Sequence, residues 1–359
     1  MPPLPAQAGA RNAVAESGIL RSMPKLFSTP LSTPARTLWI AVPSILVVLC
    51  LAAMFYLNHE PAPFEPAVRA SVHAQTHGHQ VVTGYTTTAT LIEVVDALLS
   101  KRGGYMSNDI LPPWVFLDNV PNWEFGVLTQ VRDLARAMRN DFSRSQTQST
   151  EDRDLAEADP LFHYDSERWI PPDTEGRYRK GAEALERYLT RLSSPAEPEG
   201  QFYARADNLT DWLAIVEKRL GSLSQRLSAS VGQARLNTDL SGDPEARQST
   251  ERPDVVEVKT PWTEIDDVFY EARGTAWALT HFLHAMQVDF QDVLRKKNAV
   301  VSFRQIIREL ESTQEPLHSP MVLNGSQFGL FANHSLIMAN YIARANAAII
   351  DLRKLLQEG

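Results

Sequence analysis

The sequence predicts an all-α protein: one N-terminal transmembrane helix, then an irregular, mostly antiparallel helical bundle with coiled-coil-like seams. Three observations predict this fold class. Residues Leu38–Leu57 contain no charged side chain. Three later stretches repeat apolar residues at alternating spacings of four and three, which is typical of helices that pack along a seam. Strand-like runs of β-branched residues amount to little more than Val255–Val258.

The stretch Leu38–Leu57 has the length and composition of a membrane span. As a helix it would be about 30 Å long, which is the thickness of the hydrocarbon core of a bilayer. Trp39 and Tyr56 bracket it, at the level where amphipathic rings prefer to lie. The stretch ends in the bulky residues Met54, Phe55, Tyr56 and Leu57, where a signal peptidase needs small ones, so we expect an uncleaved anchor. The lipid bilayer is therefore the first predicted partner, through Leu38–Leu57.

Charge predicts the orientation of this anchor. Residues 1–37 carry four basic residues against one acid, Glu16. Positive charge stays on the cytoplasmic side, so the N-terminus is expected inside and residues 58–359 outside. The whole chain has 35 basic and 43 acidic residues, which leaves a net charge of −11 beyond residue 37. An acidic body argues against nucleic acid as a partner.

Cysteine usage limits the chemistry that the outer part can perform. The single cysteine, Cys50, lies inside the predicted span. We therefore expect neither a disulfide nor a thiol nucleophile in the exported part. The sequence also lacks the phosphate-binding, dinucleotide-binding and metalloprotease motifs. No cofactor and no catalytic residue is assigned from it.

Composition divides the chain into four parts. Residues 1–37 are rich in Pro, Ala, Ser and Thr and predict a disordered cytoplasmic tail. Residues 38–57 are the transmembrane helix. Residues 58–82 predict a solvated juxtamembrane linker, in which three prolines favour extended backbone. Residues 83–359 predict the helical domain. The charged stretch 237–259 is its best internal boundary, and whether 81–236 and 260–359 share one core stays open.

Apolar periodicity places the helices of this domain. The first three are expected at 88–101, 123–143 and 175–193, and a polar connection is expected between the last two, over 145–159. Shorter periodicity predicts a helix at 302–313. The three seams predict long helices, and their residues are Leu209, Leu213, Val216, Leu220, Leu223 and Leu227; Ile265, Phe269, Ala272, Ala276, Leu279, Leu283, Met286, Phe290 and Val293; and Met338, Ile342, Ala345, Ile349, Leu352 and Leu356.

Three strings resemble an uncharacterised family of bacterial envelope proteins, a domain of unknown function. They are VTGYTTTATLIEVVDALLSKRGGYMSND, NWEFGVLTQVRDLARAMRNDFSRSQTQS and FYARADNLTDWLAIVEKRLGSLSQRLSASVG. The resemblance runs from about Val81 to the C-terminus. It implies a single-pass protein of the inner membrane of Gram-negative bacteria with a periplasmic C-terminal domain. It brings no reaction, ligand or catalytic residue.

The loop and helix start at 103–125 are the best candidate for a binding site. Polar groups lie there among aromatic ones, a mixture suited to binding sugars, peptides or another protein. The alternative is that the aromatic residues plug the end of the bundle, and both readings stay open. The candidates are Tyr105, Asp109, Trp114, Asp118, Asn119, Asn122, Trp123 and Glu124, with Phe116 beside them.

Two further clusters are weighed against ordinary structural roles. Arg132, Arg136 and Arg139 form a basic stripe on one predicted helix. We expect them to pair with acids of a neighbouring helix, the alternative being an anionic ligand or an acidic partner. His281 and His284 lie three residues apart on another helix and are weak metal candidates, because no further ligand lies on that face. Boundary histidines are the preferred interpretation.

These features favour a non-enzymatic, membrane-anchored module with a structural or protein-interaction role in the cell envelope. Another envelope protein is the expected partner. The alternative is a periplasmic hydrolase of cell-wall or glycan material that uses the carboxylates of residues 103–125. Self-association through an exposed seam, which would make a homo-oligomer, is a third hypothesis.

Overall fold

The computed structural model describes residues 33–145, 150–194, 200–236, 255–319, 321–326 and 329–358. The chain divides into two units, Met1–Leu49 and Cys50–Gly359. Most of the predicted tail, residues 1–32, and most of the predicted boundary loop, residues 237–254, lie outside the described residues.

The helix α1 (Thr33–Leu57) contains the predicted span. Its segment Leu38–Leu57 is long and apolar enough to cross a membrane. Most of its large apolar side chains are exposed, whereas Leu57 at its end is buried. Pro43 lies inside the helix. In a bilayer the exposed Leu, Ile and Val side chains of this segment would face lipid tails, so its exposure fits the predicted anchor.

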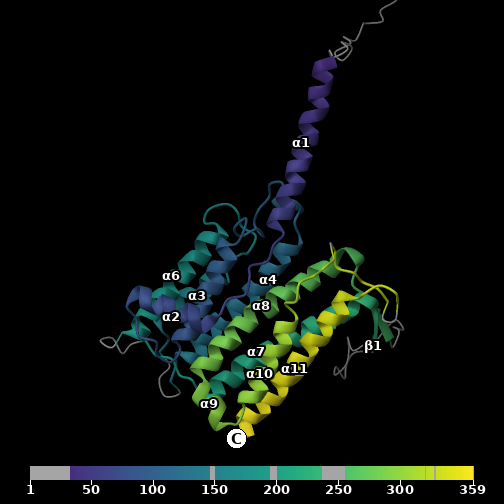
Figure 1. Cartoon of the computed structure of the whole chain (residues 1–359). Coiled ribbons are helices and arrows are strands. Elements are labelled where there is room, and N and C mark those ends of the chain that lie inside the picture. The colour runs from purple at the N-terminus through teal and green to yellow at the C-terminus, as the bar shows by residue number, and fades with distance from the viewer. Residues whose placement is uncertain are drawn as a thin grey trace, which may run out of the picture. The chain divides into compact units, whose positions relative to one another are not determined.

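The second unit is built from helices, as predicted (Figure 1). Among the described residues, β1 (Gln233–Leu236) also pairs antiparallel with β2 (Val255–Val258). The helices are α2 (Pro66–His77), α3 (Tyr85–Ser100), α4 (Asn119–Ala137), α5 (Arg153–Phe162), α6 (Thr174–Ser193), α7 (Ala206–Ser228), α8 (Ile265–Asp289), α9 (Gln291–Lys296), α10 (Val300–Ser312) and α11 (His334–Glu358).

One hydrophobic core runs through this unit from α2 to α11. The segments 81–236 and 260–359 therefore share a core, which answers the question that the sequence left open. The seam of α7 is buried throughout and packs largely on α11, whose own seam is also buried. The heptad spacing of α7 and α11 thus corresponds to packing between two helices of the same chain.

The helices α4 and α8 make the most extensive contact of the core. Asn122 contacts Asp267 near their starts, and Phe142 contacts Phe290 beyond their ends, so the two helices run in the same direction. Gly126 faces the backbone of α8, and Gly274 faces the backbone of Trp123. A methyl group at either glycine would overlap main-chain atoms of the other helix. Close backbone approach is a use to which glycine is suited, because it has no Cβ.

Two segments that were expected to be non-helical contain helices. The polar connection expected over 145–159 contains the start of α5, where the Asp152 carboxylate accepts hydrogen bonds from the amides of Asp154 (2.9 Å) and Leu155 (3.3 Å). The solvated linker expected over 58–82 contains α2, which begins with Pro66 and buries Ala70 and Ala74. Proline at the first helical position lacks only a donor that has no partner there anyway. Pro66 therefore marks the start of a helix, whereas Pro61 and Pro63 lie in the non-helical residues 58–65.

Candidate functional site

Glu124 anchors the candidate loop from beneath. Its side chain is fully buried in the first turns of α4, and Oε1 accepts hydrogen bonds from the ammonium of Lys101 and from the amide of Met106 (2.8 Å). Oε2 accepts from the amide of Ser107 (2.8 Å) and from its hydroxyl. These donors occupy the carboxylate completely, so its role in the structure is to fix residues 101–107 on α4.

Two of the candidate aromatic residues, Tyr105 and Trp123, are buried in the core. Tyr105 is buried against Tyr178 (ring centroids 5.7 Å apart), and its hydroxyl donates to the carbonyl of Ser166 at 3.1 Å. Burial raises the pKa of Tyr105 far above its ordinary value. Trp123 is buried against Trp277, with ring centroids 5.2 Å apart. Both rings thus pack inside the bundle against other aromatic rings and are not available at the surface to bind a ligand.

Three of the remaining polar candidates, Asp118, Asn119 and Asn122, lie at the start of α4. Asp118 caps this helix and accepts from the amide of Asn119 at 2.9 Å. Asn122 donates to Asp267 of α8 at 2.7 Å. The pKa of Asp267 is raised to about 6, mainly by burial and further by the negative charges of Asp118 and other nearby acids. Asp109 lies apart from this group, and much of its surface is exposed. Its pKa is raised by the partial burial of its carboxylate and by the negative charge of Glu175.

Trp114 belongs to a different environment. It is half-buried and packs with Leu117 on a small cluster of Leu57, Met106 and Val120. This cluster joins the candidate loop to the last residue of α1.

The arginine stripe contacts α5 and its flanking residues. Arg132 donates to the carbonyls of Phe162 (2.7 Å) and Tyr164 (2.9 Å), at the C-terminal end of α5 where carbonyls lack helical partners. Arg136 lies 2.8 Å from a ring nitrogen of His163. Arg139 pairs with Asp159 (3.1 Å) and Glu151 (2.8 Å). Pairing with neighbouring acids thus holds for Arg139, whereas Arg132 binds helix-end carbonyls.

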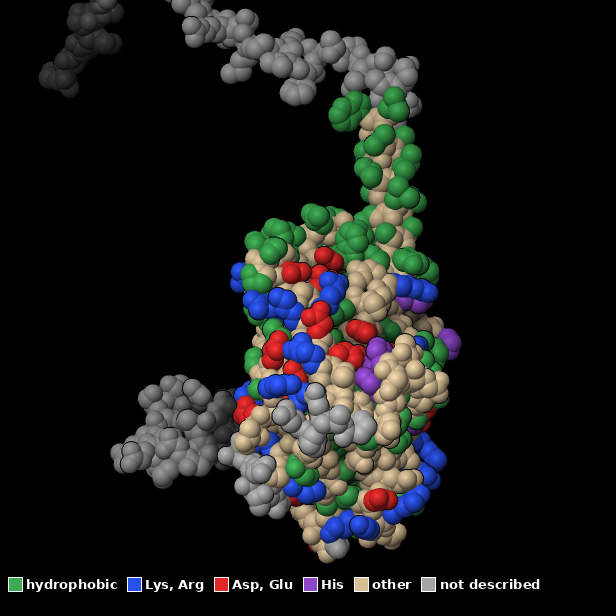
Figure 2. All heavy atoms as spheres, turned by 90° about the vertical axis from the view of Figure 1, so that its left-hand side faces the viewer, with side chains coloured by type: hydrophobic (Ala, Val, Ile, Leu, Met, Phe, Trp, Pro, Cys, Tyr) green, Lys and Arg blue, Asp and Glu red, His purple; other side chains and the backbone are tan. Residues whose placement is uncertain are grey.

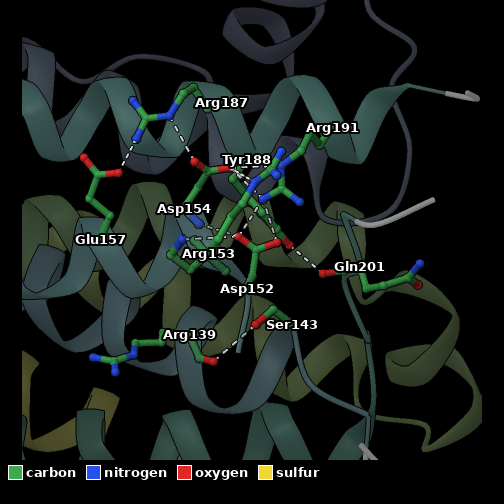
Figure 3. A network of polar contacts seen from close by, with 11 residues as sticks. Arg139, Ser143, Asp152, Arg153, Asp154, Glu157, Arg187, Tyr188, Arg191 and Gln201 are labelled. Atoms are coloured by element: carbon green, nitrogen blue, oxygen red, sulfur yellow. Dashed lines mark hydrogen bonds and ion pairs between the residues drawn. The ribbon is translucent and has the colours of Figure 1, made fainter. Parts of the chain in front are cut away.

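The opposite side of α5 carries a second ionic network, shown in Figure 3. The guanidinium of Arg191 lies 2.7 Å from Asp152 and 2.7 Å from Asp154, and all three side chains are buried. Arg187 pairs with Asp154 (3.0 Å) and with Glu157 (2.6 Å). These residues lie on α5, on its cap and on α6, and the network joins the two helices.

Each histidine of the weak metal pair has another partner. His281 Nδ1 lies 2.6 Å from the carbonyl of Trp277 and therefore donates, which leaves Nε2 to accept the amide of Phe64 at 3.0 Å. Burial lowers the pKa of His281 to about 4, so the ring is neutral. His284 Nε2 lies 3.0 Å from Glu311. Among the described residues no three His, Cys, Asp or Glu side chains are grouped so that they could hold a metal ion.

The residues directly after α1 are clamped onto α8. Glu60 forms an ion pair with Arg273, whose Nε and Nη2 lie 2.8 and 2.7 Å from the two carboxylate oxygens. Arg273 is buried and also donates to the carbonyls of Thr313 (3.1 Å) and Glu315 (2.9 Å). The Phe64 ring stacks on His281 at 4.1 Å. Glu60 and Phe64, with their partners on α8, are called the anchor clamp below.

An apolar cavity of about 370 Å³ lies beside the anchor clamp, between α8, α10 and α11. Sequence reasoning missed it, because its walls come from three helices and from the loop after α10. Its volume falls in the range of sites that bind small molecules. The apolar walls are Phe269, Leu317, Leu323, Ile337, Met338 and Tyr341, and Arg273 and His334 lie among them.

Comparison with models of protein families identifies the family of this chain. A family model described as "Uncharacterized protein conserved in bacteria (DUF2333)" matches residues 33–359. No curated protein and no solved structure matches the chain. The matched range includes α1 together with the helical body.

Proposed function

Since this chain belongs to an uncharacterised protein family conserved in bacteria, we propose that it is a single-pass inner-membrane protein whose periplasmic body binds another envelope protein. The N-terminal lead is cytoplasmic in this proposal, as its basic residues favour. The body has a structural role: it holds its partner at a defined place next to the membrane.

The anchor clamp is the observation that carries this proposal. A flexible tether would suit an enzyme that searches for dispersed substrate. Here Glu60 and Phe64 instead attach the chain to α8 within a few residues of the last turn of α1. The ion pair is largely buried, with side-chain exposures of 9% for Arg273 and 20% for Glu60. Removing one partner of such a pair is strongly destabilising, because the other charge stays buried.

The apolar cavity next to the anchor clamp is the proposed contact point. Interface energy concentrates in a few anchor side chains that fill well-packed pockets. Tyr341 and Met338 line the cavity, and both residue types are enriched at protein interfaces. We therefore assign to the cavity an apolar side chain of the partner protein.

The hydrolase alternative relied on three carboxylates of residues 103–125. Glu124 is fully buried and occupied by donors from Lys101, Met106 and Ser107. Of the three carboxylates, Asp109 and Asp118 are therefore the ones that could still act as catalytic groups in the hydrolase hypothesis. If the Asp109→Asn and Asp118→Asn variants complement a deletion strain as well as the unaltered protein, a catalytic role for these carboxylates is excluded.

Site-specific crosslinking in living cells tests the proposed function. A photoreactive amino acid replaces Tyr341 at the cavity, and the matched control replaces Val301, which is 79% exposed near the start of α10. We expect a discrete crosslinked product at position 341 that the control lacks and that Met338→Glu abolishes. Absence of any product at position 341, or an equal product at 301, would contradict the proposed contact point.

Reporter fusions to Gly359 test the orientation separately. Alkaline phosphatase, which is active outside the cytoplasm, should be active in this fusion. A fluorescent reporter that matures only in the cytoplasm should stay dark. The reverse pattern would overturn the periplasmic assignment without bearing on the cavity.

A further inference from the structure

Two loops of the body expose large apolar side chains to solvent. The first follows Asp109 and reads ILPPWVF, and the second follows Arg168 and reads WIPP. Six of their side chains, here called the apolar rim, are each more than half exposed: Ile110, Leu111, Val115, Phe116, Trp169 and Ile170. Soluble proteins seldom expose a contiguous group of large apolar side chains unless it contacts a partner or a membrane.

The two loops lie next to each other. Tyr105 donates from its hydroxyl to the carbonyl of Ser166 (3.1 Å), and Asn108 donates from its amide to the carbonyl of Arg168 (3.3 Å). These bonds hold the second loop against the base of the first. Figure 2 shows hydrophobic side chains gathered over one end of the helical body. The apolar rim is therefore one surface formed by two segments that are far apart in the sequence.

This surface adjoins the last turn of α1. Leu57, the final residue of the apolar span, packs on Met106 and Val120, and Trp114 of the first loop packs on the same cluster. The guanidinium of Arg102 lies 5.2 Å from the centre of the Tyr56 ring. A loop that contacts the final residue of a membrane-spanning helix lies at the level of the lipid headgroups.

We propose that the apolar rim inserts into the boundary between headgroups and acyl chains of the bilayer that α1 spans. The inference rests on the proposed function in one respect, namely that α1 is a membrane anchor. Apolar side chains at this depth are typical of proteins that lie on a membrane surface, where Trp and Phe are favoured. The body thus has two membrane contacts: the span of α1 and the apolar rim beside its exit.

The lipid bilayer is favoured over a protein as the occupant because of this continuity with α1. A protein partner on the apolar rim would have to displace headgroups next to Leu57 before it could bind. The anchor clamp strengthens the argument, since it attaches the chain after Leu57 to the core and so keeps the body beside the membrane. A protein occupant is the competing outcome of the test.

Depth-dependent quenching tests the proposal with the full-length protein. In a Cys50→Ala background, single variants Phe116→Cys and Ile170→Cys carry an environment-sensitive fluorophore. Val301→Cys, near the start of α10, is the matched exposed control, and Leu46→Cys within the span is the positive reference. The proteins are reconstituted into phosphatidylethanolamine and phosphatidylglycerol vesicles with or without brominated acyl chains.

We expect brominated lipid to remove most of the emission at positions 116, 170 and 46 and to leave position 301 unchanged. Emission at 116 and 170 should also shift to the blue relative to 301. Unquenched labels at 116 and 170 with a quenched label at 46 would overturn the inference while the anchor stands. An unquenched label at 46 would instead refute the anchor, and the inference with it.

Discussion

Replacing Gly274 of α8 by alanine probes the backbone contact between α4 and α8. The new Cβ would lie 2.8 Å from the carbonyl carbon of Trp123 and 3.0 Å from its Cα. Main-chain atoms cannot rotate away, so the two helices must separate. Overpacking of this kind costs about 1–3 kcal/mol, whereas alanine gains about 1 kcal/mol over glycine in helix propensity. Because separation also loosens Trp123 against Trp277, we expect a net loss of about 2 kcal/mol.

Gly221 provides the matched control for this substitution. It lies inside α7, and a Cβ there would meet its nearest neighbour, the side-chain nitrogen of Asn346, at an ordinary 3.5 Å. Thermal unfolding of the full chain in detergent, followed by circular dichroism, should show Tm lowered by about 4 °C for Gly274→Ala and raised by about 2 °C for Gly221→Ala. Gly126→Ala should act like Gly274→Ala, and the double variant should lose less than the sum, because one separation relieves both overlaps. A Gly274→Ala protein as stable as the unaltered one would refute the reasoning.

Three further predictions concern charged groups. Glu124→Gln leaves the Lys101 ammonium buried without its charge partner, and chemical denaturation should show a loss of about 3–5 kcal/mol that adding Lys101→Met partly restores. Asp267 has a folded-state pKa of about 6, above its unfolded value, so folding takes up a proton and stability rises as the pH falls from 7 towards 4. Asp267→Asn should remove this pH dependence and stabilise the protein at pH 7 by up to about 1 kcal/mol, once screening at this partly exposed site is allowed for; unchanged pH dependence would contradict the assignment. Glu60→Gln should expose residues 58–65 to limited proteolysis, whereas a cleavage rate equal to that of the unaltered protein would mean that the ion pair with Arg273 does not hold this segment.

Apolar periodicity predicted the long helices well, because each of them buries a stripe along most of its length. The helix expected at 175–193 is α6, Thr174–Ser193, and every residue of the seam expected from Leu209 to Leu227 is buried. α5 escaped detection because it is short and acidic and contains Pro160. Its signal, visible afterwards, is the capping Asp152 followed by the buried Leu155, Ala158 and Phe162.

Composition located the candidate loop, but it could not predict which residues of the loop are buried and which are exposed. The burial of Glu124 depends on Lys101 and on the amides of Met106 and Ser107, which only the tertiary fold brings together. Nothing local distinguishes Trp123, which is buried, from Phe116, which is exposed. The cavity could not be predicted from the sequence either, because its walls come from separate helices.

The anchor clamp has a mechanical consequence. Asn58 and His59 alone separate the end of α1 from Glu60, and the partners Arg273, Trp277 and His281 follow one another at one-turn intervals along α8. A pull on the chain at Asn58 would therefore be passed directly to α8, whereas a longer and more flexible connection would absorb it.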